Sequence, residues 1–393
     1  MRPIIKSLLD TDLYKLTMLQ AYYHQYPNAT GKWVFHCRNK DIKLGFLADE
    51  VLDQVRSLRS LLLVKEEADY LLSLGYFKED FVRWFQNDFE INLDNLKVYS
   101  DDEGQLQITV EGKLTEVNIL EVYTLAIVNE LYFQHDLKES GYVLEDVEKE
   151  GRFRLETKVE QLEDYPQLKF AEFGTRRRYS AEWQDFVVGY LVKNCPKNIV
   201  GTSNVGLAMK HGIKPIGTVA HEWTMSHLGL VDRLEQAQGR ALHVWQQEYG
   251  DDLGIALTDT FTSEAFFRDF QFPTARAYDG VRQDSGDPIE FGEKMIAHYE
   301  KVGIDARRKF IIFSDGLTIE KAINIWRHFA GRVGVSFGIG TSLSNDVGRT
   351  PLNIVMKLLV CNGVDLVKLG DDAGKNMGED YQVKAVKKAY KVK

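Results

Sequence analysis

Hydrophobic positions in the first part of the chain follow two different periods. From Thr11 to Tyr26 apolar side chains recur at helical spacing behind an Asp/Thr start, which predicts a helix. Between Lys32 and Arg38 apolar and polar residues alternate, as in a half-buried strand. The runs Lys97 to Ser100 and Gln105 to Glu111 predict paired strands around a turn, and Val117 to Leu137 has a helical pattern. This mixture indicates an α+β region.

From residue 168 onward the pattern changes to short apolar runs, each followed by small and polar residues and then a helix-like segment. The seven runs are 168–171, 198–200, 216–220, 255–257, 275–278, 310–313 and 333–337. Strands that alternate with helices indicate parallel pairing and right-handed crossovers. We therefore expect a β/α barrel, whose active site lies at the carboxyl ends of its strands. A doubly wound open sheet would place its polar residues similarly and stays the alternative.

Two further apolar runs near the C-terminus, Ile354 to Val360 and Val364 to Leu369, flank Cys361-Asn362-Gly363. Asn-Gly between apolar runs is a strong hairpin signal. We expect this hairpin to return to the N-terminal region. The predicted organisation is an N-terminal α+β domain at 1–145, a barrel-like catalytic domain at 146–350 and a C-terminal segment at 351–393 that completes the first domain.

Composition narrows the class of protein. Apolar residues make up 44% and charged residues 27% of 393 residues, as in a globular protein. The formal charge of −9 disfavours a nucleic-acid-coating protein but not small phosphorylated ligands. No stretch approaches the ~18–20 apolar residues of a membrane span, and the first residues lack a signal-peptide pattern. Because Cys37, Cys195 and Cys361 are scattered, no disulfide framework is expected. We expect a cytoplasmic protein without nucleic-acid or membrane partners.

Two familiar motifs are excluded by spacing or absence. His221-Glu222 followed by His227 resembles a zinc-protease helix, but the histidines are six positions apart instead of four. Six residues turn a helix by about 600°, so the two side chains diverge. The chain also has no Gly-x-Ser-x-Gly elbow, and a hydrolase triad therefore has no starting point.

Two glycine-containing segments, Ser314-Asp315-Gly316 and Gly338-Ile339-Gly340-Thr341, follow the last two predicted strands. Glycine lets the backbone approach a ligand closely, and free N–H groups at a helix start attract anions. The last two βα loops are also the usual phosphate site of a barrel. Each segment alone has the pattern of an ordinary turn, but their shared position favours phosphate binding.

Charged side chains also follow the predicted strands. Arg282 and Asp284 could pair with phosphate and bind Mg2+ respectively, whereas Asp287 before a proline fits a helix N-cap. The run Arg176-Arg177-Arg178 stands at a predicted helix start, where positive charge is unfavourable. We expect at least one of these arginines to meet an anion.

These segments, taken in order, resemble the nicotinate phosphoribosyltransferase family over nearly the whole chain. The matching motifs are Asp12 to Lys15, Phe173 to Arg177, Gly217 to Glu222, Val281 to Asp287, Ser314 to Leu317, Gly338 to Leu343 and Leu366 to Leu369. The segment 370–374 departs from the family's more usual serine- and proline-containing version. The resemblance implies an irregular seven-stranded β/α barrel beside an N-terminal α/β domain, and a homodimer with shared active sites.

The reaction implied by the resemblance joins nicotinate to 5-phosphoribosyl 1-pyrophosphate in NAD salvage. It gives nicotinate mononucleotide and pyrophosphate, and it is coupled to hydrolysis of ATP, which is a ligase-type classification. The implied cofactor is Mg2+, with ATP as a co-substrate and no tightly bound organic cofactor.

The resemblance also assigns roles to the residues that bind the base. Phe173 and Tyr14 would sandwich the aromatic ring, with Tyr14 contributed by the partner subunit. Thr218 and Arg282 would bind the nicotinate carboxylate. Nicotinamide-using relatives carry an aspartate where this chain has Ser203, a neutral side chain that can donate to a carboxylate.

The remaining roles concern phosphates. By the same resemblance, Arg176 would bind phosphoribosyl pyrophosphate, and Asp284 would lie near the ribose or near Mg2+ on the pyrophosphate. His221 would be phosphorylated by ATP. The 5′-phosphate would be cradled by Ser314, Asp315, Gly316, Gly340 and Thr341.

Three other functions stay open from the sequence. One is a nicotinamide or other phosphoribosyltransferase. Another is a phosphosugar aldolase or isomerase, which would need a Schiff-base lysine; the only plausible strand lysine, Lys368, falls in the late hairpin and not among the barrel strand ends. The third is a non-catalytic binding or scaffold protein, which would not need so many polar strand ends.

Overall fold

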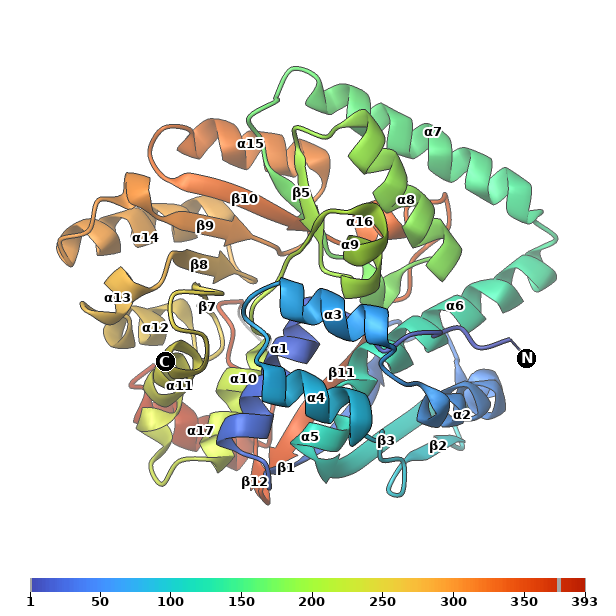
Figure 1. Cartoon of the computed structure of the whole chain (residues 1–393), viewed down its shortest axis with the longest axis horizontal. Helices are drawn as coiled ribbons and strands as arrows, with labels where there is room; N and C mark the ends of the chain where they lie inside the picture. Colours follow the sequence, from blue (N-terminus) through green and yellow to red (C-terminus); the bar gives the residue numbers. More distant parts are fainter. Residues whose placement is uncertain (1, 373–375, 393) are drawn as a thin grey trace.

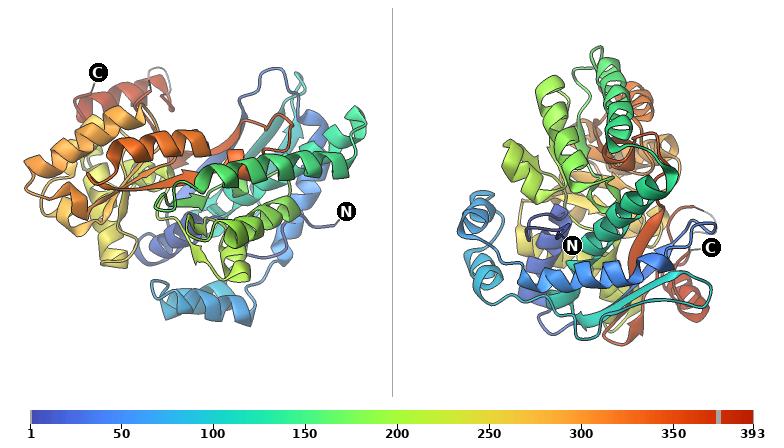
Figure 2. Two further views of the ribbon diagram at one scale, coloured as in Figure 1. Left: turned by 90° about the horizontal axis from the view of Figure 1, so that it is seen from above. Right: turned by 90° about the vertical axis from the view of Figure 1, so that its right-hand side faces the viewer.

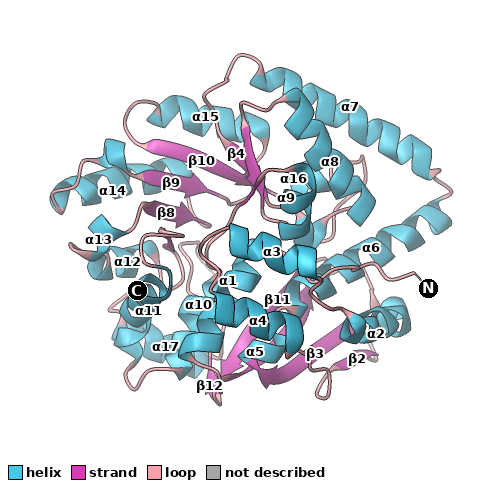
Figure 3. Ribbon diagram, in the orientation of Figure 1, coloured by secondary structure: helices cyan, strands magenta, loops and turns pink. Residues whose placement is uncertain are grey.

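The computed structural model describes residues 2–372 and 376–392 and contains two sheets (Figure 1). Residues 373–375 lie outside the described residues, and so does the end of the segment 370–374 that departs from the family pattern. Figure 3 shows the strands in magenta, with the parallel sheet in the upper part of the view and the antiparallel sheet in the lower part.

The parallel sheet has seven strands in the order β6-β5-β4-β10-β9-β8-β7. These are β4 (Phe170–Glu172), β5 (Ile199–Thr202), β6 (Lys214–Pro215), β7 (Ile255–Leu257), β8 (Gly280–Gln283), β9 (Phe310–Phe313) and β10 (Gly334–Ile339). The sheet curls, but β6 and β7 form its two edges and are not paired with each other in the described chain. The prediction of an irregular β/α barrel is therefore confirmed in the form of a half-barrel.

Two of the predicted barrel strands are wrong. The run 275–278 belongs largely to a short helix, α13 (Thr274–Ala277), because alanine and arginine favour helix and follow Pro273. The strand β8 begins afterwards at Gly280, where an added Cβ would stand 2.2 Å from the carbonyl oxygen of Phe310 on β9. The run 216–220 is a loop after β6, since Gly217 has a φ of +151° that takes the backbone out of the extended strand.

The antiparallel sheet joins both ends of the chain. Its order is β12-β11-β1-β3-β2, formed by β1 (Thr30–Cys37), β2 (Lys97–Ser100), β3 (Leu106–Lys113), β11 (Ile354–Cys361) and β12 (Val364–Asp365). The predicted hairpin at Asn362-Gly363 is confirmed, and both residues have positive φ, of 48° and 78°. Its second strand is shorter than predicted. Because β11 pairs with β1, the hairpin completes the N-terminal sheet.

The last helix returns instead to the barrel side of the molecule, where Figure 2 shows it in red near the C-terminus. Tyr390 stacks on Phe261 with ring centroids 4.7 Å apart. Its hydroxyl oxygen accepts a hydrogen bond from the backbone N–H of Gln238 at 2.9 Å. The C-terminal segment therefore contributes to the antiparallel sheet and also contacts α11 (Ala237–Tyr249) and the loop after β7.

Helices surround the two sheets. They are α1 (Leu13–Gln25), α2 (Ala48–Ser57), α3 (Lys65–Ser73), α4 (Glu79–Asn87), α5 (Leu114–Val117), α6 (Leu120–Ser140), α7 (Leu144–Leu162), α8 (Ala181–Asn194), α9 (Val205–His211), α10 (His221–Ser226), α11 (Ala237–Tyr249), α12 (Ser263–Asp269), α14 (Pro288–Lys301), α15 (Ile319–Phe329), α16 (Thr341–Ser344) and α17 (Asp380–Ala389). In α1 every side chain from Leu13 to Tyr22 is buried, and so is every side chain from Leu120 to Leu131 in the first part of α6. None of the helices within the described ranges has the length and apolar character needed to cross a membrane.

Candidate active site

The carboxyl ends of the parallel strands bring the predicted charged residues together. Arg282, at the end of β8, donates through Nε to the Ser314 hydroxyl oxygen at 3.1 Å and through Nη1 to the Val219 carbonyl at 3.3 Å. Its Nη2 lies 3.4 Å from Oδ1 of Asp284. Ser314 also donates to Asp284 at 2.6 Å. One guanidinium therefore connects the loops that follow β6, β8 and β9.

His221 opens α10 at this edge, between two carboxylates. Its Nε2 lies 2.9 Å from Oδ1 of Asp259, and its Nδ1 lies 3.8 Å from Oδ2 of Asp284. Because a carboxylate accepts hydrogen bonds, the Asp259 contact places the imidazole proton on Nε2 and leaves the lone pair on Nδ1. Burial lowers the pKa of His221, and the nearby Lys368 lowers it further, although Asp259 opposes this shift. The ring is therefore neutral near pH 7.

Asp259 and Lys368 were not predicted as site residues. Asp259 is fully buried and accepts hydrogen bonds from Ser285 at 2.6 Å as well as from His221. Lys368 lies with its Nζ 3.2 Å from Asp259. The expectation that Lys368 stays away from the barrel strand ends is therefore wrong: it follows the short β12 and reaches back to the site. The position of Asp259 directly after β7 was a usable signal, whereas Lys368 gave none.

The loop after β4 carries the predicted aromatic residue. The buried Glu172 accepts a hydrogen bond from the Gly174 N–H at 2.6 Å, which fixes the turn. The half-buried ring of Phe173 lies against Gly338 on β10, where an added Cβ would come within 2.4 Å of it. Glycine at position 338 is therefore required by the close approach of this ring.

Tyr14 lies on the buried face of α1, near the same loop. The Arg176 guanidinium is 5.8 Å from the centroid of its ring, and its hydroxyl group is 3.5 Å from Oε2 of Glu121. The structure therefore brings Tyr14 to Arg176 of the same chain. A ring sandwich with Phe173 across a dimer stays a prediction.

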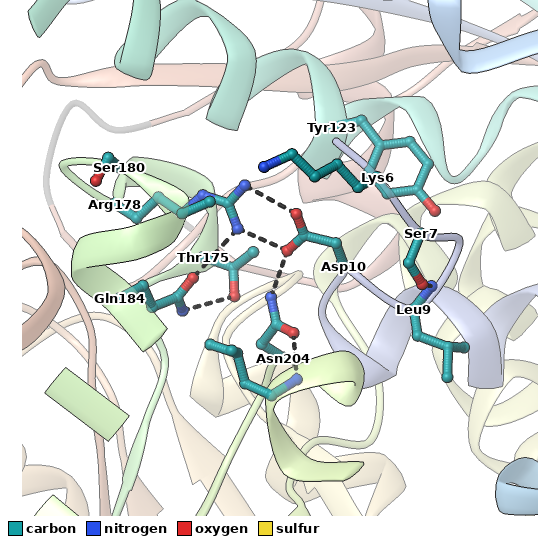
Figure 4. Close-up of polar contacts among 12 residues, drawn as sticks. Lys6, Ser7, Leu9, Asp10, Tyr123, Thr175, Arg178, Ser180, Gln184 and Asn204 are labelled. Atoms are coloured by element: carbon teal, nitrogen blue, oxygen red, sulfur yellow. Dashed lines mark hydrogen bonds and ion pairs between the residues drawn. The ribbon is translucent and has the colours of Figure 1, made fainter. Parts of the chain in front are cut away.

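The three consecutive arginines have three different environments. Arg176 is 40% exposed, with Glu121 at 3.4 Å and Asp12 at 3.8 Å. Arg177 donates to the carbonyl of Ile354 on β11. Arg178 is buried and donates to both carboxylate oxygens of Asp10, at 2.6 and 2.9 Å (Figure 4). The expectation that an arginine meets an anion is confirmed, but the one that forms two hydrogen bonds to a carboxylate is Arg178.

Ser203 and Thr218 have their hydroxyl protons engaged within the protein. Ser203 donates to Oδ1 of Asp12 at 2.6 Å, and Thr218 donates to the Ile255 carbonyl at 3.0 Å. Burial raises the pKa of Asp12, with Arg176 acting in the opposite direction. The structure therefore differs from the expectation that Ser203 is free to donate to a substrate, because its hydroxyl group donates to the carboxylate of Asp12.

The two predicted phosphate segments lie side by side. The hydroxyl of Ser342 donates to the carbonyl of Leu317 at 2.7 Å, which joins the loop after β10 to the loop after β9. Asp315 and Gly316 are exposed, and Gly316 has a φ of +55°. Gly340 precedes Thr341 at the start of α16, and an added Cβ there would lie 2.9 Å from the Phe173 carbonyl. The structure therefore brings together the phosphate segments and the aromatic loop.

Asp284 is the only predicted metal ligand, and its surroundings limit what it could hold. Its Oδ1 accepts from Ser314 and faces Arg282. Within residues 2–372 and 376–392, no three histidine, cysteine or acidic side chains form a metal-binding group. A magnesium ion would fit only if substrate phosphates and water supplied most of its ligands, which is its usual mode in phosphoryl enzymes.

A curled β/α sheet with glycine-containing loops, arginines and a half-buried aromatic ring at its carboxyl edge is typical of an enzyme that acts on phosphorylated small molecules. Comparison with known proteins specifies the group. The model of the nicotinate phosphoribosyltransferase (NAPRTase) family matches residues 168–393, and the model of its N-terminal domain matches residues 9–129. The chain belongs to the nicotinate phosphoribosyltransferase family.

Individual relatives agree with this assignment. The nicotinate phosphoribosyltransferase of Acinetobacter baylyi is 46% identical over 391 residues, which cover 97% of this chain and 94% of the relative. The crystal structure of nicotinate phosphoribosyltransferase from Porphyromonas gingivalis has a TM-score of 0.92 at 36% identity, covering 99% of this chain and 100% of that one. The crystal structure of nicotinate phosphoribosyltransferase from Vibrio cholerae has a TM-score of 0.93 at 34% identity, covering 100% of this chain and 94% of that one.

Proposed function

We propose that this chain synthesises nicotinate mononucleotide from nicotinate and 5-phosphoribosyl 1-pyrophosphate in NAD biosynthesis, with ATP as a co-substrate. Pyrophosphate, ADP and phosphate are the other products. The observation that carries the ATP-dependent part is the position of His221 at the carboxyl edge. Its Nε2 lies 2.9 Å from Asp259, and its unprotonated Nδ1 lies 3.8 Å from Asp284.

In the transfer step the pyridine nitrogen of nicotinate attacks C1 of the ribose, and the bond from C1 to the pyrophosphate oxygen breaks. The nitrogen already has a free lone pair, so no general base is needed. Positioning and stabilisation of charge must supply the catalysis. Arg282 would bind the nicotinate carboxylate, while Phe173 and Tyr14 flank the ring. Thr218 could donate to the same carboxylate only after its hydroxyl leaves the Ile255 carbonyl.

The phosphate groups of the second substrate need positive charge and free backbone N–H groups. Arg176 suits the pyrophosphate, since its side chain is partly exposed and its contacts with Glu121 and Asp12 are long. The loops at Ser314–Gly316 and Gly340–Thr341 would hold the 5′-phosphate. Bound Mg2+ would neutralise part of the pyrophosphate charge, with Asp284 as its candidate protein ligand.

ATP would be used through His221. The lone pair of Nδ1 attacks the γ-phosphorus, a P–N bond forms and the P–O bond to ADP breaks. Water later cleaves the P–N bond and releases phosphate. The cycle can drive synthesis only because the phosphorylated and free enzymes bind substrates and products with different affinities. A homodimer with shared active sites and a cytoplasmic location stay predictions.

The test is a turnover assay with phosphoribosyl pyrophosphate and each of nicotinate, nicotinamide and quinolinate, with and without ATP. We expect turnover with nicotinate, stimulated by ATP, and little with the other two bases. Equal turnover of nicotinamide would contradict the substrate assignment. Nicotinate turnover that ATP leaves unchanged would contradict the coupling alone.

A further inference from the structure

A lysine ammonium lies fully buried beneath the candidate site, between its two halves. Lys15, on α1, has no solvent-exposed surface. Its Nζ lies 2.6 Å from Oε2 of Glu121, forms a second ion pair with Glu222 and donates to the Asn118 amide oxygen at 3.1 Å. None of the transfer or phosphorylation steps above uses this group.

The first carboxylate partner of Lys15, Glu121, contacts the residues proposed to bind the substrates. Glu121, on α6, reaches Arg176 at 3.4 Å through its other oxygen and lies 3.5 Å from the Tyr14 hydroxyl. Burial alone would raise the pKa of Glu121, but Lys15 and then Arg176 outweigh it, so that the carboxyl stays ionised. Glu121 thereby accepts a hydrogen bond from Nη1 of Arg176.

The second carboxylate partner of Lys15, Glu222, lies on the helix that carries His221. Glu222 is the next residue after His221 in α10 and is almost fully buried. Its Oε2 accepts from the indole N–H of Trp33 at 3.3 Å, while its other oxygen pairs with Lys15. The only charged partner of Glu222 among the described ion pairs is therefore Lys15.

A buried lysine between two buried carboxylates adds little to the free energy of unfolding compared with apolar packing. Burying a charge carries a penalty of several kcal/mol, and well-packed apolar side chains often replace buried ion pairs without loss of stability. Without Lys15, the carboxylates of Glu121 and Glu222 would face each other in a dry interior. Burial and the neighbouring Glu121 raise the pKa of Glu222, and Lys15 opposes this shift, so a buried cation favours the state in which both carboxylates are ionised.

We propose that Lys15 is a positioning residue that ties Arg176 and Tyr14, through Glu121, to the helix that carries His221, through Glu222. The substrate-binding arginine and the phosphate-accepting histidine are thus held in a fixed relation by one ammonium group. The part of the proposal that concerns His221 rests on the proposed ATP-dependent function. The part that concerns Arg176 requires only the transfer reaction.

The proposal predicts a pattern across three variants. Glu121→Gln removes the tie to Arg176 and should raise KM for phosphoribosyl pyrophosphate by about tenfold while ATP stimulation is retained. Glu222→Gln removes the tie to α10 and should reduce the ATP stimulation factor by about fivefold, with KM changed less than about twofold. Lys15→Met should show both effects.

The matched control is Lys309→Met. Lys309 is also buried, but its Nζ donates to the carbonyls of Arg276 and Tyr278 beside the amino end of β9, on the opposite edge of the sheet from the site. We expect the control to lose thermal stability without any change in KM or ATP stimulation. Both quantities are independent of the fraction of active enzyme, so a purely structural role leaves them unchanged.

Measurement of KM and ATP stimulation in all four variants, well below their melting temperatures, tests the proposal. The proposal is overturned if Lys15→Met changes only the fraction of active enzyme and leaves KM and ATP stimulation unaltered. If Lys15→Met does not fold, the same result for Glu121→Gln and Glu222→Gln overturns it. It is also overturned if the two glutamine variants affect the same parameter. If wild-type turnover shows no ATP stimulation, the proposed function fails in its ATP step, and the KM results still decide the role of Glu121 and Lys15.

Discussion

Replacing Arg178 by alanine should destabilise the fold, whereas replacing Arg176 should weaken substrate binding and leave stability almost unchanged. The Arg178 side chain is 1% exposed and forms two short hydrogen bonds to Asp10. When the guanidinium is removed, Asn204 is the one side chain among the described residues that still donates to the Asp10 carboxylate. Leaving one partner of a buried ion pair costs about 3–5 kcal/mol. Because Asp10 is 19% exposed, we expect a loss near the lower limit, about 3 kcal/mol.

Arg176 differs in exposure and in geometry. Its side chain is 40% exposed and its two carboxylate contacts are 3.4 and 3.8 Å long. Asp12 and Glu121 are themselves buried, but Ser203 still donates to Asp12 and Lys15 still pairs with Glu121 when Arg176 is removed. The loss of the two contacts should therefore cost less stability than the Arg178 pair, about 1 kcal/mol. If it binds the pyrophosphate, each charged hydrogen bond lost should cost about 1.5–3 kcal/mol, or roughly 10- to 150-fold in kcat/KM.

Thermal unfolding and steady-state kinetics measure the two effects. For a chain of this length, a loss of about 3 kcal/mol corresponds to a fall in Tm of roughly 4 °C. Arg178→Ala should show that fall in Tm with an unchanged KM in the folded enzyme. Arg176→Ala should show a raised KM with an almost unchanged Tm. A large fall in Tm for Arg176→Ala with unaltered KM would refute the reasoning.

The Arg178 effect should also depend on pH. Burial alone would raise the pKa of Asp10, but Arg178 outweighs it and holds this pKa below its ordinary value of 3.8. A lowered folded-state pKa contributes stability above the unfolded pKa and loses it as pH falls through the folded one. The stability difference between wild type and Arg178→Ala should therefore be constant from pH 5 to 7 and shrink below about pH 4.

Three further predictions concern the site. Ser203→Asp would place a second carboxylate beside Asp12, which Ser203 now contacts at 2.6 Å. The substitution should lower the preference for nicotinate over nicotinamide by about tenfold, and an unchanged ratio of the two kcat/KM values would contradict this. Arg282→Ala should both raise KM for nicotinate and lower Tm, because Arg282 also joins Ser314 to the Val219 carbonyl; a change in only one of the two would show that it has a single role. Removing divalent cations with a chelator should abolish turnover, with Mg2+ restoring it, while Tm stays the same; a fall in Tm would instead indicate a structural ion.

The sequence predicted the parts of the fold that depend on local patterns. The alternation around β1 and the Asn-Gly turn before β12 are local signals, and both elements are present. The run 275–278 was misassigned because a short apolar run fits a buried strand or a helix equally well. The open edge between β6 and β7 depends on how far the whole sheet curls, which no local pattern encodes.

The site was predictable where a residue directly follows a strand. Arg282, Ser314 and Phe173 stand at such positions, and the structure brings their loops together. Lys15 and Lys368 were not predictable in the same way, because they reach the site from α1 and from beyond the late hairpin. Their contacts arise from the packing of segments far apart in the sequence.

Mapping the phosphorylation site tests the ATP-coupled mechanism most directly. The protein is incubated with [γ-32P]ATP, and the label is characterised in wild type and in His221→Asn. We expect an acid-labile, base-stable label on His221 that is absent from the variant, which should keep slow nicotinate transfer but lose its stimulation by ATP. A variant that still becomes labelled and is still stimulated by ATP would contradict the role assigned to His221.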